Sequence, residues 1–114
     1  IVFSMAVSNT DDHFRNHGFI LTEDGWRLSP MYDVNPDIYG ENLSLNVDEY
    51  DSSIDFNLAI EASSYYGLSS KEAEDGVDEI KKIVKNNWQR LAKDYDISRG
   101  QIEKMKPAFR ECEY

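Results

Sequence analysis

A chain of 114 residues, 40% of them hydrophobic, has the size of one small domain with its own apolar core. Its net charge of −10 argues against binding to the phosphate backbone of DNA or RNA, because that binding depends on Lys and Arg. Cys112 is the single cysteine, and no apolar run reaches the roughly 18–20 residues of a membrane span. We therefore expect a cytoplasmic protein that binds neither nucleic acid nor membrane directly.

The first part of the sequence predicts a short helix and a β-hairpin. Ile1–Val7 is apolar and typical of the end of a buried helix, and because no polar lead-in precedes it we expect a fragment of a longer protein. Residues 18–21 and 26–28 are short apolar or aromatic runs, and the Asp24-Gly25 pair between them is a strong hairpin signal. Two antiparallel strands that turn near this pair are therefore expected.

One further strand and a first long helix are expected after the hairpin. The alternation of Leu43–Val47 predicts a third short strand. Residues 54–66 predict a helix, with Ser53 as its N-cap and Gly67 as its C-terminal stop.

Two capping boxes predict the starts of the later helices. Ser69 with Glu72, and Ser98 with Gln101, have the spacing at which a serine and an acidic or amide side chain cap a helix. Pro107 interrupts the last helix. The helix that begins at Ser69 carries an apolar stripe expected to face the core: Ala73, Val77, Ile80, Ile83, Val84, Trp88 and Leu91. The predicted fold is mainly α with a small β-hairpin.

Aromatic residues outside this stripe are also expected inside the protein. We place Trp26 of the hairpin in the core, and Tyr65 and Tyr66 between packed helices. The acidic stretch Asp48–Asp51 is expected to be a solvated loop.

The predicted hairpin brings oxygen-bearing side chains together. Asn16 lies eight residues before Asp24 and Asp33 nine residues after it, so strands that run out and back return both to the same end. Asp11, five residues before Asn16, is expected in the same small volume. Two carboxylates and an amide oxygen are ligands suited to Mg²⁺. For the Asp11–Asn16 pair taken alone, the alternative is an ordinary Asx-turn.

Two histidines raise a second metal hypothesis. His13 and His17 have the spacing of a zinc-binding pair on a helix, with Asp11 or Asp12 as a third ligand. The polar sequence around them, which includes Gly18, argues against a helix, so we interpret both as ordinary loop histidines.

The order of these residues is that of a kinase active site. In protein kinases a catalytic Asp is followed five positions later by a metal-binding Asn, and a further metal-binding Asp comes later. Asp11, Asn16 and Asp33 reproduce this order. Moreover, Asn9–Asn16 resembles the N-x-D-x-H-x-K-N catalytic loop of the HipA-type serine/threonine kinases, which are toxins of bacterial toxin–antitoxin pairs, and Leu28–Asp33 resembles their L-x-P-x-Y-D segment.

The resemblance implies a role for each motif residue. Asp11 would be the catalytic base, and Asn16 and Asp33 would hold the Mg²⁺ that bridges the phosphates of ATP. His13 and Arg15 would lie on the cofactor side of the site, His13 shaping the loop and Arg15 placing a positive charge near the transferred phosphate. Arg15 departs from the lysine usual in the family.

The resemblance also sets expectations for the rest of the chain. Asp12 is expected to be a solvent-facing neighbour of the base; the alternative is a swap of roles with Asp11, and the five-residue spacing favours Asp11 as the base. Residues 1–47 would carry the catalytic loop, hairpin and metal-binding segment of a kinase-like C-terminal lobe, and residues 48–114 its helical bundle. No Gly-rich phosphate loop and no strand lysine for ATP occur in the sequence, so the chain alone is expected to be inactive.

The function implied by the resemblance is phosphoryl transfer from ATP-Mg²⁺ to a serine or threonine of a cytoplasmic protein. The family implies a protein substrate among translation components, such as an aminoacyl-tRNA synthetase, and restraint by a HipB-like DNA-binding antitoxin. The alternative is a non-catalytic helical protein-interaction domain that docks a partner on its acidic surface.

Overall fold

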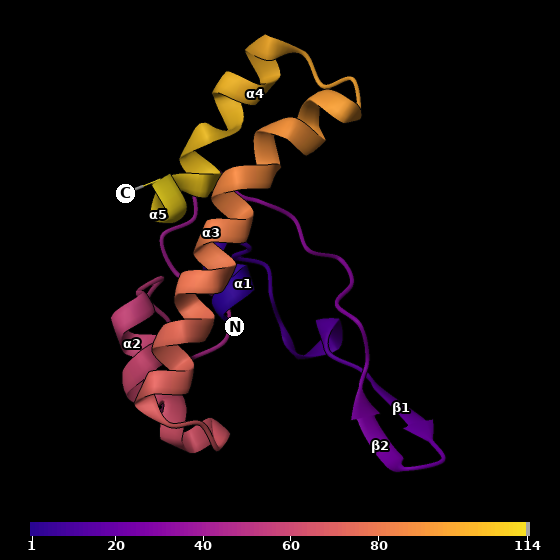
Figure 1. The fold of residues 1–114 in the computed structure, drawn as a ribbon, viewed down its shortest axis with the longest axis vertical. Coiled ribbons are helices and arrows are strands. Elements are labelled where there is room, and N and C mark those ends of the chain that lie inside the picture. Colours follow the sequence, from indigo (N-terminus) through magenta and orange to yellow (C-terminus); the bar gives the residue numbers. More distant parts are fainter. Residues whose placement is uncertain (114) are drawn as a thin grey trace.

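A 25-residue helix, α3 (Ser70–Asp94), forms the spine of the computed structural model, which describes residues 1–113 (Figure 1). Helix α1 (Val2–Ala6) and helix α2 (Phe56–Glu61) pack against α3, while α4 (Arg99–Met105) and α5 (Arg110–Glu113) fold back along its second half. The mainly helical fold with one hairpin is confirmed. The predicted bundle extends to residue 114, which lies outside the described residues.

The starts of α3 and α4 are fixed by local sequence. The Ser69 hydroxyl accepts a hydrogen bond from the backbone N–H of Glu72, and the Glu72 carboxylate accepts one from the backbone N–H of Ser69. Ser98 and Gln101 make the same reciprocal pair. Both predicted capping boxes are confirmed. After α4 the chain tightens into the 3₁₀ helix η3 (Lys106–Phe109), where Pro107 lacks the N–H that an α-helix needs.

The core lies where α1, α4 and α5 meet the second half of α3. Trp88 stacks on Phe109 with ring centroids 4.1 Å apart and planes inclined by 10°. Of the predicted stripe, Ile83 and Leu91 remain about half exposed, because they flank the buried line on α3. The buried residues of this cluster are Ala6, Val7, Val84, Trp88, Ile102, Ala108, Phe109 and Cys112.

Strands β1 (Phe19–Thr22) and β2 (Gly25–Leu28) form the predicted antiparallel hairpin, which projects away from the helices (Figure 1). Thr22 pairs with Gly25, so the turn consists of Glu23 and Asp24, one residue earlier than the Asp24-Gly25 pair suggested. The prediction that Trp26 lies in the core is wrong. Its side chain is 68% exposed, because no helix covers either face of the hairpin in the described structure.

The segment between the hairpin and α2 differs from the prediction. No strand forms over Leu43–Val47; within the described residues its neighbourhood contributes one isolated bridge, between Asn42 and Ser53. Leu43 and Val47 are both buried beside Met5 and Ala62. The alternating pattern therefore comes from two apolar side chains that attach an irregular loop to the core, and not from a strand.

The first predicted helix is shorter and begins later than expected. Asp55, and not Ser53, caps α2 by accepting a hydrogen bond from the backbone N–H of Asn57. The chain then continues as the 3₁₀ helix η2 (Ala62–Tyr66) up to Gly67, which has φ 74° and stops the helix as predicted. Tyr65 does not pack between helices, since it is 72% exposed.

Tyr66 is also half exposed, although its hydroxyl donates a 2.6 Å hydrogen bond to the carbonyl of Val47.

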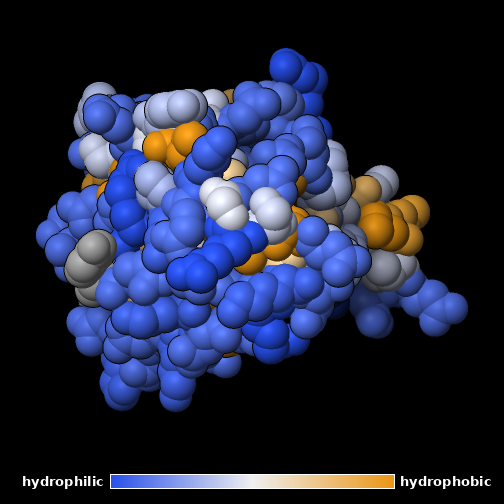
Figure 2. Space-filling model, turned by 90° about the horizontal axis from the view of Figure 1, so that it is seen from above, coloured by the Kyte–Doolittle hydropathy of each residue, from blue (hydrophilic) through white to orange (hydrophobic). Residues whose placement is uncertain are grey.

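Hydrophilic residues dominate the face seen in Figure 2, in keeping with the net charge of −10. Within residues 1–113, no helix is both long and apolar enough to cross a lipid bilayer.

Candidate functional site

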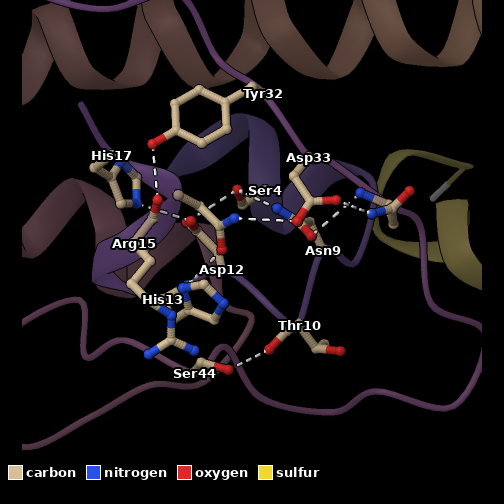
Figure 3. A network of polar contacts seen from close by, with 12 residues as sticks. Ser4, Asn9, Thr10, Asp12, His13, Arg15, His17, Tyr32, Asp33 and Ser44 are labelled. Carbon is tan, nitrogen blue, oxygen red and sulfur yellow. Dashed lines mark hydrogen bonds and ion pairs between the residues drawn. The ribbon is translucent and has the colours of Figure 1, made fainter. Parts of the chain in front are cut away.

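The hairpin brings Asn16 and Asp33 into contact, as the sequence predicted. Asn16 ends the 3₁₀ helix η1 (Phe14–Asn16), and its Nδ2 donates a 3.2 Å hydrogen bond to Oδ2 of Asp33. The base of the hairpin is closed by a second contact, in which the Tyr32 hydroxyl donates a 2.7 Å hydrogen bond to the carbonyl of Arg15 (Figure 3). The loop before β1 and the segment after β2 therefore lie side by side.

Asp33 adopts a left-handed backbone conformation, and its side chain is exposed. Its φ of 54° lies in the left-handed region, which non-glycine residues adopt rarely and Asp more readily than most. Besides Asn16, the Asp33 carboxylate accepts a 2.9 Å hydrogen bond from Nδ2 of Asn35. In residues 1–113 no cation pairs with this carboxylate, so its negative charge is not neutralised.

Asn16 and Asp33 carry oxygen atoms of the kind that Mg²⁺ binds, and in this structure the amide nitrogen of Asn16 is the atom that contacts Asp33. Oδ1 of Asn16 accepts a 3.2 Å hydrogen bond from the backbone N–H of His13, and an amide oxygen has a second lone pair to offer. Asp33 supplies a carboxylate whose partners are neutral amides. One carboxylate and one amide oxygen, completed by water and phosphate oxygens, are typical of Mg²⁺ sites.

Asp11 and Asp12 are adjacent acids in opposite environments. The Asp11 side chain is exposed and has no hydrogen bond or ion pair in the described part of the chain. Asp12 is only 7% exposed, so the prediction that it faces solvent is wrong. Its Oδ1 lies 2.8 Å from Nε2 of His17, and its Oδ2 accepts a 3.3 Å hydrogen bond from the Ser4 hydroxyl of α1 (Figure 3). Asp12 therefore anchors the loop.

Asn9 is a structural member of the site that sequence reasoning left without a role. It is 2% exposed, and its Nδ2 donates a 3.3 Å hydrogen bond to the Ser4 hydroxyl. Its Oδ1 accepts a 3.3 Å hydrogen bond from the backbone N–H of Asn35. Asn9 thus links α1 to the segment that contains Asp33. Its position at the start of the loop motif was the available signal.

Thr10 ties the other side of the loop to the segment before α2. Its hydroxyl donates a 2.9 Å hydrogen bond to Oδ2 of Asp37, and its carbonyl accepts one of 2.5 Å from the Ser44 hydroxyl. The pKa of Asp37 is lowered, chiefly because the backbone N–H of Tyr39 donates to it and also because Thr10 does. Gly40 packs directly against Thr10, since a Cβ there would lie 2.1 Å from Thr10 Cγ2.

The two residues predicted for the cofactor side lie on the same loop. His13 is partly buried, and its Nδ1 has no hydrogen-bond partner in the structure of residues 1–113. Arg15 is exposed, and its guanidinium makes no hydrogen bond or ion pair within the same residues. For the zinc hypothesis, His17 is instead engaged with Asp12, and the described chain contains no group of three His, Cys, Asp or Glu side chains placed to hold a metal ion.

A comparison of the sequence with known protein families identifies the family of this chain. The chain matches the HipA-like C-terminal domain over residues 1–88, a span that contains the whole site and most of α3. No curated protein and no solved structure matches the chain. The family match confirms the resemblance that the two motifs indicated. The chain belongs to the HipA-like C-terminal domains and hence to the HipA kinase family.

Proposed function

We propose that the chain is the C-terminal lobe of a HipA-like serine/threonine protein kinase that transfers phosphate from ATP-Mg²⁺ to a protein. The observation that carries this proposal is the contact between Asn16 and Asp33, with the exposed Asp11 on the same loop. The three residues stand in the order of the kinase catalytic machinery. In this proposal residues 1–47 carry the chemistry and residues 48–114 support it.

Each side chain has a defined task in the proposed reaction. Asn16 and Asp33 would hold Mg²⁺, which when bound neutralises charge on the phosphates of ATP. Asp33 suits this task because its carboxylate is exposed and its hydrogen-bond partners in the described part of the chain are amide donors. The exposed Asp11 accepts the hydrogen bond of the substrate hydroxyl and orients it towards the phosphate. Because the transition state is loose, this positioning matters more than early removal of the proton.

Two further residues serve the cofactor side in the same proposal. The exposed guanidinium of Arg15 supplies a positive charge near the transferred phosphate, with a fork of donors in place of the single ammonium of lysine. His13 shapes the loop, since its backbone N–H donates to the amide oxygen of Asn16.

The proposal requires a second lobe for the rest of the nucleotide. This sequence contains no Gly-rich phosphate loop and no strand lysine, so we propose that another part of the full-length protein supplies them and that the chain alone is inactive. Family membership supports a cytoplasmic translation component, such as an aminoacyl-tRNA synthetase, as substrate and a HipB-like DNA-binding antitoxin as partner.

Substitution of the three residues in the full-length protein tests the proposal. Asn16→Ala and Asp33→Asn should lower Mg²⁺-dependent phosphoryl transfer by orders of magnitude, because each removes an oxygen ligand or its charge. Asp11→Asn should abolish transfer while ATP binding is largely kept. Asn86→Ala and Asp24→Asn are matched controls at exposed positions of α3 and the hairpin turn. Near-parental transfer by all three site variants would refute the kinase and favour a non-catalytic interaction domain.

A further inference from the structure

The residues on both sides of Asp11 make side-chain hydrogen bonds to other parts of the protein. Asp11 itself has no side-chain partner among the described residues. The preceding residue, Thr10, is bonded to the segment between the hairpin and α2. The following residue, Asp12, is bonded to α1 and to His17. A residue whose own side chain is free is therefore held through its two neighbours.

The hydrogen bonds of Asp12 connect the loop to the buried part of the protein. Ser4, which donates to Asp12, is completely buried in α1. His17 directly follows the 3₁₀ helix η1, and Asp12 precedes it. The 2.8 Å contact between Nε2 of His17 and Oδ1 of Asp12 therefore joins the two ends of that turn. Because Asp12 is almost fully buried, a hydrogen-bonded partner lost here leaves a carboxylate poorly satisfied.

The Thr10 side connects residues distant in sequence. Its partners Asp37 and Ser44 lie 27 and 34 positions along the chain. Asp37 is itself placed by its backbone N–H, which donates a 3.0 Å hydrogen bond to the carbonyl of Ser8. Together with the bond from the backbone N–H of Asn35 to Asn9, four hydrogen bonds thus join residues 8–10 to the segment that follows Asp33.

We propose that Thr10 and Asp12 are positioning residues that together hold Asp11 where it orients the substrate hydroxyl. The inference rests on the proposed kinase function. The physical reason is that fixing the residues on both sides of Asp11 restricts the peptide units that carry its Cα. A displacement of about 1 Å at a reacting group can lower a rate about 100-fold. Neither residue belongs to the metal ligands, so their loss acts on geometry.

Paired variants in the full-length protein separate positioning from mere stability. Thr10→Val removes the hydroxyl with little change of shape, whereas Thr10→Ser keeps it. His17→Ala removes the partner of Asp12, whereas His17→Gln keeps an N–H donor at a similar reach. Asp75→Asn is the control, because it breaks an exposed Lys71–Asp75 ion pair on α3.

Three measurements are made on each variant: kcat, KM for ATP, and amide hydrogen exchange of residues 10–17. Thr10→Val and His17→Ala should lower kcat between about 10-fold and 100-fold, with KM for ATP changed less than about twofold. Exchange in this segment should become faster in both. The Ser and Gln variants should recover most of kcat and protection, and Asp75→Asn should match the parent.

The outcomes distinguish this inference from the proposed function. If Asp11→Asn is inactive while Thr10→Val and His17→Ala keep the parental kcat, the positioning role is overturned and the kinase stands. If hydrogen exchange in residues 10–17 is unchanged in both variants, the claim that the contacts of Thr10 and Asp12 hold this loop in place is refuted. If Asp11→Asn transfers phosphate as well as the parent, the proposed function fails and the inference with it.

Discussion

Replacing Gly40 by alanine should push the loop that carries Asp11 out of place. A Cβ at residue 40 would lie 2.1 Å from Cγ2, 2.7 Å from Oγ1 and 2.9 Å from Cβ of Thr10, whereas ordinary contacts begin near 3.4 Å. Rotation of the Thr10 side chain does not relieve the overlap, because Thr10 Cβ itself is too close. Measured against a contact of 3.4 Å, the shortfall is 0.5 Å at Thr10 Cβ and 1.3 Å at Cγ2, so the two segments must separate by an amount between these values.

The surroundings of Gly40 resist this separation. Nη2 of Arg110 donates a 2.6 Å hydrogen bond to the carbonyl of Gly40, and Thr10 is bonded to Asp37 and Ser44. Inserting a methyl group into such a contact typically costs about 1–3 kcal/mol of stability. If Asp11 moves by about 1 Å with its neighbour, kcat should fall by as much as about 100-fold.

Thermal unfolding and phosphoryl transfer of the full-length Gly40→Ala variant measure the two effects. Gly76→Ala on α3 is the matched control, because a Cβ there meets no atom of residues 1–113 within 4 Å. It should leave transfer unchanged and raise stability by about 0.5–1 kcal/mol, since alanine favours a helix interior over glycine. A Gly40→Ala protein with the parental unfolding temperature and the parental kcat would refute the reasoning from this contact.

Two further predictions concern the helical bundle. Trp88→Ala should lower the free energy of unfolding by about 3–5 kcal/mol, because it removes a buried ring stacked on Phe109. Trp26→Ala at an exposed hairpin position should lower it far less. Equal losses for the two variants would contradict the burial described here. Ser69→Ala should cost about 1 kcal/mol through loss of the N-cap of α3. Hydrogen bonds from the backbone N–H and hydroxyl of Ser69 lower the pKa of Glu72 below its ordinary 4.5, so their contribution is present above that pH and is lost as pH falls through the lowered pKa. The difference between Ser69→Ala and the parent should therefore shrink in acid, and a pH-independent difference would contradict this account.

The sequence by itself determined the features that depend on neighbours along the chain. The capping boxes at Ser69 and Ser98 join residues three positions apart, so their partners are readable from the sequence. The hairpin likewise follows from a turn between two apolar runs, and it returns the chain so that Asn16 and Asp33 lie at the same end. The family motifs were readable for the same reason.

The tertiary structure decided which groups are covered and which meet across long distances. Asp11 and Asp12 are the same residue type side by side, and only the packing of Ser4 and His17 places Asp12 inside and leaves Asp11 exposed. Trp26 is exposed because no helix among residues 1–113 covers the hairpin, which the apolar character of Trp26 does not reveal. Burial depends on what the folded chain places opposite a side chain, so composition and periodicity indicate it only when the covering element is itself predictable.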